Sequence, residues 1–237
     1  MLHQHIIVKE IDRADPQIID ELGRAGVATA HEAAGRVGLI GPAIHARQQN
    51  FRAAGSAVTV LSHPGDNLMI HAAIEVCQPG DLLVVATTSP STDGMFGELF
   101  ATSLVQRGVN AIVSDAGVRD IADLREMRFG VWSRAIHAQG TVKASPGSVN
   151  VPVVVDGQTV NPGDIVLADD DGVFVSPSSS GPQLVEAVRR RLANEQEKRE
   201  RFARGELGVD IYGFRTLLEQ LGVKTVQSVP ADQKVAR

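Results

Sequence analysis

The sequence predicts an α/β fold with a β-rich second half and a long helix that projects from the body of the protein. Two apolar runs, 82–86 and 111–115, are typical of strands that are covered on both faces. A series of short strand-like segments follows between residues 131 and 175. The helix that begins near Pro182 loses its apolar spacing after residue 192, so we expect its far half to lie in solvent.

In the first half of the chain, helices are predicted to alternate with strands. Ile18, Leu22 and Val27 give residues 16–35 one apolar side, so this stretch is expected to be a single helix. The elements that follow are a strand at 54–61, a helix at 68–76, a strand at 82–86, a helix from Glu98 to near Gly108, a strand at 111–115, and a short helix with Ile121, Leu124 and Met127.

The second half contains closely spaced turns, such as Asp156-Gly157 and Asn161-Pro162-Gly163. Strands this short and this close together favour a small barrel or a layered sheet. The predicted segments are 131–133, 135–136, 152–155, 159–160, 164–167 and 173–175.

One domain is expected over residues 1–221, with a loosely held tail at 222–237. Within the last long helix, Leu184, Val188 and Leu192 are spaced four apart, and the charged run 194–201 follows them. The near half should therefore pack on the domain. The far half can be a solvated charged face, or it can reach a neighbouring subunit. We expect the second, with the helix at about 182–205 taking part in oligomer contacts.

Composition argues against several classes of protein. A net charge of -5 and a pI near 5.8 give no broad basic surface for a nucleic acid. Cys77 is the only cysteine, so an intramolecular disulfide is impossible and a reducing compartment is favoured. The start of the chain lacks a signal-peptide pattern, and no apolar run approaches the roughly 20 residues of a membrane span. We expect a cytoplasmic protein that binds neither nucleic acid nor membrane.

Several common catalytic motifs are absent from the sequence: zinc-ligand spacing, the G-x-S-x-G elbow, the phosphate-binding P-loop and the dinucleotide fingerprint. Of the five lysines, only Lys143 falls within a predicted β segment, so a Schiff-base mechanism is not favoured. The acidic run 169–171 precedes Gly172 between two strands and is expected to be a turn rather than a calcium site.

The loop after the strand at 82–86 is the first candidate for a binding site. It contains Gly94 and Gly97 and leads into a helix at Glu98, whose first amides, those of Leu99 and Phe100, are expected to lack partners. Such donors suit the carboxylate of a small anionic substrate. The alternative is an ordinary helix start with no ligand.

Arg119 and Asp120, after the strand at 111–115, form the second candidate. Adjacent side chains on extended backbone point in different directions, so a mutual ion pair is not expected. Arg119 can grip a carboxylate or an enolate oxygen, while Asp120 can ligate a hard cation in a largely hydrated site. Glu98 is the natural second carboxylate. The alternative is a pair of solvated loop charges.

Three sequence blocks together resemble a known family: residues 97–103, 115–120 and 160–166. In this order and spacing they are similar to the 4-hydroxy-4-methyl-2-oxoglutarate and 4-carboxy-4-hydroxy-2-oxoadipate aldolases, which share their fold with the regulator of ribonuclease activity A. The resemblance covers residues 29–210 and includes the family's active-site pattern, an acidic residue followed 21 positions later by Arg-Asp, here Glu98, Arg119 and Asp120.

The resemblance implies a layered α/β/β sandwich like the swivelling phosphohistidine domain, assembled into trimers or hexamers with active sites between subunits. It also implies that Asp120 ligates Mg²⁺ or Mn²⁺, and that Glu98 holds a metal-bound water.

The same resemblance assigns the substrate contacts. Arg119, with the loop at Gly97 and the amides of Leu99 and Phe100, would bind the pyruvyl group. A glutamate from the neighbour's C-terminal helix, Glu195 or Glu197, would complete the site.

The implied reaction is a metal-dependent retro-aldol cleavage in aromatic-acid catabolism. It would yield pyruvate and oxaloacetate from 4-carboxy-4-hydroxy-2-oxoadipate, or two pyruvates from 4-hydroxy-4-methyl-2-oxoglutarate, with oxaloacetate decarboxylation as a side activity. One rival is a non-catalytic regulator that binds a ribonuclease, which would have no need of Arg119 and Asp120. The other is a phosphohistidine carrier, for which His137 is the candidate.

Overall fold

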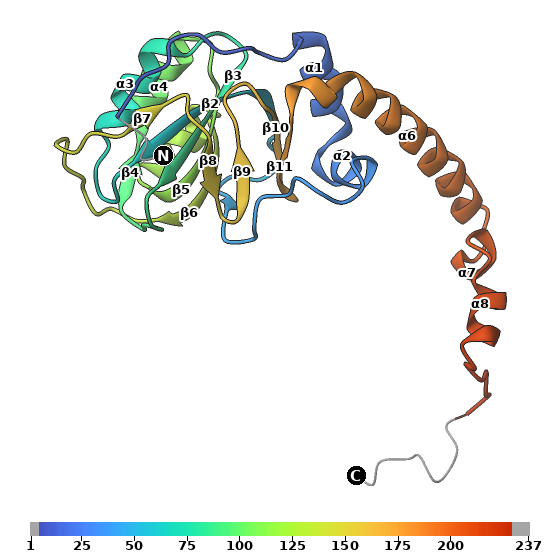
Figure 1. The fold of residues 1–237 in the computed structure, drawn as a ribbon. Coiled ribbons are helices and arrows are strands. Elements are labelled where there is room, and N and C mark those ends of the chain that lie inside the picture. Colours follow the sequence, from blue (N-terminus) through green and yellow to red (C-terminus); the bar gives the residue numbers. More distant parts are fainter. Residues whose placement is uncertain (1–4, 229–237) are drawn as a thin grey trace, which may run out of the picture. The chain divides into compact units, whose positions relative to one another are not determined.

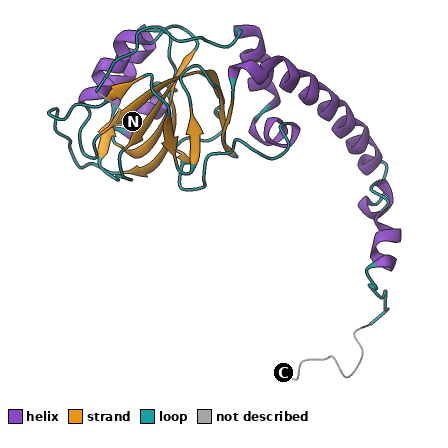
Figure 2. Cartoon of the chain, viewed as in Figure 1, coloured by secondary structure: helices purple, strands orange, loops and turns teal. Residues whose placement is uncertain are grey.

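The computed structural model describes residues 5–228, and the chain divides into two compact units between Arg191 and Leu192. The first unit contains a curved mixed sheet with helices packed on it (Figures 1 and 2). The predicted α/β class is confirmed. No helix among the described residues is long and apolar enough to cross a membrane.

The main sheet has four parallel strands in its middle, and the strands next to them run antiparallel. Its order is β1 (His45–Ala46), β6 (Gly130–Ile136), β5 (Ala111–Val118), β3 (Asp81–Thr87), β2 (Ala53–Ser62), β10 (Ile165–Asp169) and β11 (Gly172–Ser176). Outside this path, β4 (Gly94–Phe96) pairs with β5, and β7 (Ser148–Val149) pairs with β2.

The segment 38–46 joins the two ends of this sheet. At one end, Ile40 N donates to Val173 O at 2.9 Å and Val175 N donates to Gly38 O at 2.7 Å. A few residues later, β1 pairs with β6 at the opposite end of the sheet. The sheet is therefore a nearly closed barrel, in which β10 and β11 lie in the same sheet as the parallel strands instead of forming a separate β layer. The likeness to the swivelling phosphohistidine domain stays a prediction.

Apolar side chains fill the barrel interior. Trp132 of β6 is fully buried there, and its indole Nε1 donates to Asp169 O at 2.8 Å, so the one polar atom of the ring is satisfied. A two-stranded hairpin of β8 (Val153–Val155) and β9 (Gln158–Val160) supplies further apolar side chains to this interior. Thr59 Oγ1 donates to Val151 O at 2.6 Å and ties the approach to the hairpin to β2.

Helices cover the outside of the sheet. The first group, α3 (Leu68–Val76), α4 (Glu98–Gln106) and α5 (Ile121–Glu126), packs against the outward residues of β2, β3 and β5. The second group packs on β10 and β11 and consists of α1 (Pro16–Ala25), α2 (Val27–Ala33) and the buried side of α6 (Gly181–Ala203), which a 3₁₀ turn at Ser178–Ser180 precedes. Figure 1 shows α3 and α4 on one face of the sheet and α1 beside β10 and β11.

The single helix expected over residues 16–35 was wrong. Gly26, with φ 85° and ψ 165°, ends α1, and α2 starts at the next residue. The Val27 amide donates to Asp169 Oδ2 at 2.9 Å, so the break gives a buried carboxylate of the sheet its partner. The apolar spacing on either side of Gly26 is helical, which is why periodicity alone did not reveal the break.

The second unit begins inside α6 and contains α7 (Gly208–Ile211) and α8 (Phe214–Gln220). The ring of Tyr212 stacks on Phe214 at 5.2 Å between centroids, and Lys198 Nζ lies 4.6 Å from the centroid of the Tyr212 ring. The boundary between the two compact units lies within residues 1–221, and the expectation of one domain over that range stays a prediction. Of the predicted tail, residues 222–228 contain no helix or strand, and the rest lies outside the described residues.

An ion pair beneath α1 offers a test of the fold's energetics. Asp81 is buried, and both of its oxygens accept bonds from Arg13, at 2.8 and 2.9 Å, while the Gln78 amide donates to Oδ2 at 2.7 Å. Asp81→Asn should lower the free energy of unfolding in urea by about 2–4 kcal/mol, because it leaves Arg13 without its counter-charge. Asp20→Asn, which removes an exposed pair with Arg24, is the matched control and should leave it unchanged. Equal effects of the two variants would contradict this account.

Candidate active site

The two predicted site loops meet because β5 has a second parallel partner near its carboxyl end. Gly94 and Phe96 of β4 pair with Gly117 and Val118, and the Arg119 amide then donates to Phe96 O at 2.9 Å. The loop that starts α4 therefore lies directly beside the loop that starts α5. Ligands of α/β sheets gather beyond the carboxyl ends of parallel strands, and both loops lie there.

A glycine makes this contact possible. A Cβ atom built on Gly97 would lie 2.3 Å from Asp120 Oδ2, closer than any side chain allows. Without a Cβ atom at Gly97, the Asp120 carboxylate can approach the backbone of this loop. Its Oδ2 accepts a hydrogen bond from the Glu98 amide at 3.2 Å. Gly97 is thus required by the close packing of the two loops, since its φ of -157° is extended backbone open to any residue.

Asp120 has left-handed backbone, with φ 54° and ψ 36°, at the start of α5. The turn swings its side chain back, so Asp120 Oδ2 lies 3.6 Å from Arg119 Nε. The expectation that these neighbours would not pair was wrong, because it assumed extended backbone at Asp120. Among the described residues, Oδ1 of Asp120 accepts no hydrogen bond, which leaves it open to a ligand.

Glu98 opens α4 and turns its side chain along the helix, where its Oε1 accepts a bond from Thr102 Oγ1 at 2.7 Å. The Leu99 amide donates to no described residue, and its side chain is 78% exposed. The Phe100 amide donates to Gly97 O at 3.2 Å, so of the two predicted amide donors only Leu99 keeps a fully available N–H group.

A cavity of about 170 Å³ lies at this junction. Two cationic side chains, Arg119 and Lys143, line it together with the Asp120 carboxylate. The remaining lining residues come from α3, β4 and α4 and include Asn67, His71, Met95, Leu99, Phe100 and Ser103. A pocket with two cations and one carboxylate fits a small anion and a cation side by side.

His71 and Lys143 are site residues that the sequence did not reveal. The imidazole of His71 packs on the Phe100 ring, with 4.4 Å between centroids. Burial, and then the nearby Lys143 ammonium, lower the pKa of His71. The ring is therefore neutral at pH 7, so it can donate one hydrogen bond and accept another.

Lys143 lies in a bend rather than in the β segment that was predicted for it, and it reaches the pocket because the neighbouring carboxylate Asp66 holds its loop. Asp66 is buried and accepts the amides of Ala144 at 2.8 Å and Ser145 at 2.6 Å, and that of Leu68 at 2.9 Å. Burial acts to raise the pKa of Asp66, but these three backbone donors outweigh it and lower the pKa. No sequence pattern near Lys143 points to this contact.

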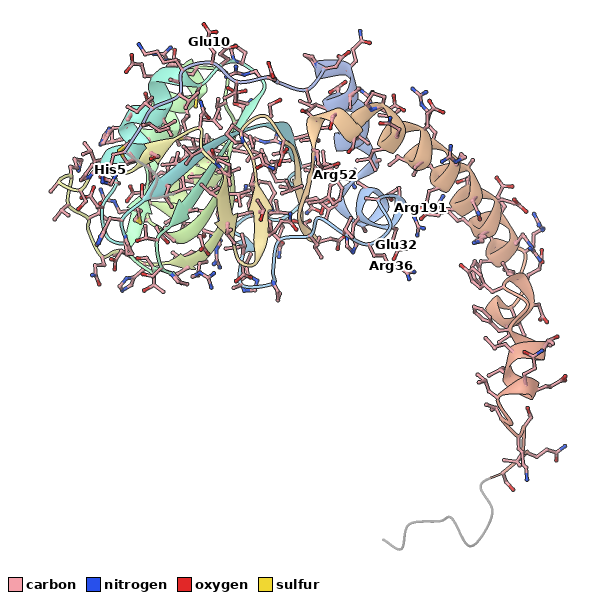
Figure 3. The ribbon with its side chains drawn as sticks, in the orientation of Figure 1. His5, Glu10, Glu32, Arg36, Arg52 and Arg191 are labelled. Atoms are coloured by element: carbon pink, nitrogen blue, oxygen red, sulfur yellow. The ribbon has the colours of Figure 1, made fainter. Side chains whose placement is uncertain are left out.

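Several other polar and charged side chains lie away from this pocket. Glu32 pairs with Arg36 at 3.1 Å and with Arg191 at 3.5 Å, an arrangement that Figure 3 shows beside α2, and the hydrogen bond from Arg36 lowers the pKa of Glu32. His31 Nδ1 lies 3.1 Å from Val37 O. These side chains support the packing of α2 and α6. Glu195 lies on α6 beyond Arg191, in the second unit, and its contact with a neighbouring site stays a prediction.

Comparison with known proteins assigns the family. Residues 16–175, more than half of the chain, match the model of the RraA-like family, described as Aldolase/RraA. The chain belongs to this family. The match spans the β4–α4 and β5–α5 loops that hold Gly97, Glu98, Arg119 and Asp120.

Two relatives of this RraA-like protein carry the name "Putative 4-hydroxy-4-methyl-2-oxoglutarate aldolase". The relative from Halalkalibacterium halodurans is 27% identical over 173 residues, which cover 73% of this chain and 80% of the relative. The one from Burkholderia multivorans is 36% identical over 153 residues, or 63% of this chain and 93% of the relative. The expected resemblance to this aldolase family is confirmed.

A solved structure shares the fold of this RraA-like protein. The structure of RraAS2 from Streptomyces coelicolor, described as an unusual member of the RNase ES inhibitor RraA protein family, has a TM-score of 0.69 and 28% identity. The matched region covers 83% of the present chain and 100% of the Streptomyces chain. The family thus joins proteins named as aldolases with proteins named as ribonuclease inhibitors.

The anchoring role of Asp66 predicts a particular dependence of stability on pH. Asp66→Asn should lower the free energy of unfolding by about 1–3 kcal/mol at pH 7, because an amide cannot accept all three backbone donors. The folded pKa of Asp66 lies below the unfolded value of about 3.9, so its contribution is complete above that pH and is lost as the pH falls through the lowered pKa. Urea unfolding of both proteins from pH 7 downward measures this. A difference that widens on acidification would contradict it.

Proposed function

We propose that this chain is a divalent-metal-dependent aldolase that releases pyruvate from a 4-hydroxy-2-oxo acid. The observation that carries the proposal is one small pocket lined by Arg119, Asp120, Leu99 and Lys143. Glu98 lies next to it at the start of α4, where its amide donates to Asp120 Oδ2. The names of the two relatives support the same reaction class.

The residues at the junction fit Mg²⁺ or Mn²⁺. The described residues contain no group of three or more His, Cys, Asp or Glu side chains placed to hold a metal, so a tightly caged ion such as structural zinc is not favoured. Mg²⁺ keeps several water ligands and needs one or two carboxylates, and Asp120 Oδ1 is open for that role. We assign Asp120 as the direct ligand and Glu98 as the carboxylate that holds water beside it. When bound, the ion would stabilise negative charge on the substrate's oxygens.

Arg119 is assigned to the charge that develops during cleavage. Breaking the C3–C4 bond of a 4-hydroxy-2-oxo acid leaves an enolate, and the former keto oxygen becomes negative. A guanidinium fixed beside that oxygen lowers the barrier because it needs no reorientation as the charge forms. The loop at Gly97 and the amides of Leu99 and Phe100 are assigned to the pyruvyl carboxylate, with the Leu99 amide the more available donor. Glu98, acting on a water molecule, is assigned to accept the proton of the C4 hydroxyl.

The substrates that fit are 4-carboxy-4-hydroxy-2-oxoadipate, which would give pyruvate and oxaloacetate, and 4-hydroxy-4-methyl-2-oxoglutarate, which would give two pyruvates. Both belong to aromatic-acid catabolism. Oxaloacetate forms the same enolate when it loses CO₂, so decarboxylation is proposed as a side activity. We place the enzyme in the cytoplasm, as a homotrimer or homohexamer with no nucleic-acid or membrane partner.

Removing the charge of Asp120 or of Arg119 should strongly reduce turnover. Pyruvate release from 4-carboxy-4-hydroxy-2-oxoadipate, coupled to lactate dehydrogenase, should require Mg²⁺ and stop with chelator. Asp120→Asn and Arg119→Ala should each lower kcat by about 10²–10³, since each removes a preorganised charge partner. Asp123→Asn, on the exposed side of the same helix, is the matched control and should keep wild-type turnover. Full activity of Asp120→Asn would sink the proposal.

Shared sites between subunits predict complementation. If Glu195 of one subunit serves the Asp120 site of another, Glu195→Gln and Asp120→Asn proteins should each be inactive alone. Mixed and refolded together, they should recover part of the wild-type kcat, because some sites then receive both carboxylates. Glu197→Gln in place of Glu195→Gln decides which glutamate is used. No recovery with either variant would argue that each site is built within one subunit.

A second candidate is a non-catalytic protein that binds a ribonuclease. The likeness to the Streptomyces structure described as a member of the ribonuclease-inhibitor family favours it. Folded wild-type protein that releases no pyruvate with Mg²⁺ or Mn²⁺ would move the assignment to this class.

A further inference from the structure

A second cavity, of about 660 Å³, lies away from the candidate active site and shares no lining residue with it. Its walls are the segment that follows β1 and the end of α5 with the loop after it: Ala46, Arg47, Gln48, Gln49, Asn50, Phe51, Arg125, Arg128 and Phe129. Three of these residues are arginines, and none of the described lining residues is acidic. In a chain of net charge -5, this local excess of positive charge is unusual.

Arg47 is a half-buried cation without a counter-charge. Its Nε donates to Ser133 Oγ at 2.8 Å and its Nη2 to Ser133 O, both of which are neutral acceptors. No carboxylate of the described residues pairs with it. Burial lowers the pKa of Arg47, as expected for a partly desolvated guanidinium whose hydrogen-bond acceptors are neutral. A charge kept in this condition is stabilised by an anion that enters the cavity.

Arg125 and Arg128 bring two more cations to the same cavity. Arg125 Nε donates to Arg47 O at 2.8 Å, which fixes this side chain against the segment after β1. Arg128 has left-handed backbone with φ 53°, a conformation that favours glycine, yet an arginine occupies the position. The carbonyls of Leu124 and Arg125 accept the amides of Phe129 and Arg128, so the end of α5 is already satisfied by its own backbone.

We propose that this arginine cavity, the pocket lined by Arg47, Arg125 and Arg128, binds a small anion that carries a phosphate group. Guanidinium groups present planar pairs of donors that match phosphate oxygens, and a phosphate at neutral pH offsets more than one of the three charges. The site is a cavity and not an extended stripe. Its two aromatic residues pack into the protein, Phe51 against Trp132 and Phe129 against Phe96, so no stacking surface for a nucleic acid is present among the described lining residues.

One acidic side chain touches the rim from outside. Asp170 Oδ2 accepts the Asn50 amide at 2.9 Å, and Asp170 does not line the cavity. Its Oδ2 accepts this backbone donor, and no ion pair between Asp170 and any of the three arginines is found among the described residues.

Isothermal titration calorimetry with sodium phosphate and with pyrophosphate, at constant ionic strength set by NaCl, tests the proposal. Wild type should bind saturably, and Arg125→Gln and Arg128→Gly should each raise Kd by about tenfold or more, as expected for the loss of a charged hydrogen bond. Arg128→Gly suits its positive φ and should fold normally, which circular dichroism checks. Arg107→Gln, an exposed arginine outside both cavities, is the control and should bind as wild type does.

Arg119→Ala separates this site from the candidate active site, where phosphate could also bind. The arginine cavity predicts that Arg119→Ala keeps the binding that Arg125→Gln loses. Binding that is lost in Arg119→Ala and kept in the two cavity variants would overturn the proposal. If Arg107→Gln weakened phosphate binding as much as the cavity variants do, the attraction would be diffuse and the proposal would also be overturned. The absence of saturable phosphate binding to the wild type would overturn it as well. None of these outcomes depends on whether the protein is an aldolase.

Discussion

The pairing of β4 with β5 is the constraint on which the candidate site depends. It adds a short parallel strand beside the carboxyl end of β5, with Gly94 opposite Gly117 and Phe96 opposite Val118 after a shift in register. The start of α4 is thereby set against the start of α5. The rest of the domain supports that strand end. The barrel interior fixes the strands from within, and α3, α4 and α5 fix them from outside. Exposed polar groups at such an edge can keep a fixed geometry because the backbone beneath them is held from both sides.

Much of the fold could be predicted from the sequence, because buried parallel strands leave an unbroken apolar pattern. The runs at 82–86 and 111–115 are strands, and the spacing from Pro182 onward is a helix. The break at Gly26 was missed, since apolar spacing continues across it and the carboxylate that accepts the Val27 amide is more than a hundred residues away. Closure of the sheet by the segment 38–46 was also missed, since its partners lie at both ends of the sheet and no local pattern marks them.

The candidate site was predictable only where its residues lie directly after a strand or at the start of a helix. Arg119 and Asp120 follow a strand, and Glu98 starts a helix, so a strand-end argument finds all three. His71 and Lys143 reach the pocket through tertiary contacts, and a bend held by a buried carboxylate leaves no periodic signal. The orientation of Asp120 depends on one left-handed residue, which sequence reasoning had treated as extended.

That left-handed conformation of Asp120 has an evolutionary consequence. Asparagine and aspartate tolerate this backbone better than other residues with a Cβ atom, and only aspartate carries a charge there. A lineage could exchange one for the other and lose the charge while the loop and the fold beneath it survive. If Asp120 is the metal ligand proposed above, a catalyst and a non-catalytic binding protein would be separated by one replacement at small energetic expense. That would give a physical reason why a single family holds proteins named as aldolases and proteins named as ribonuclease inhibitors.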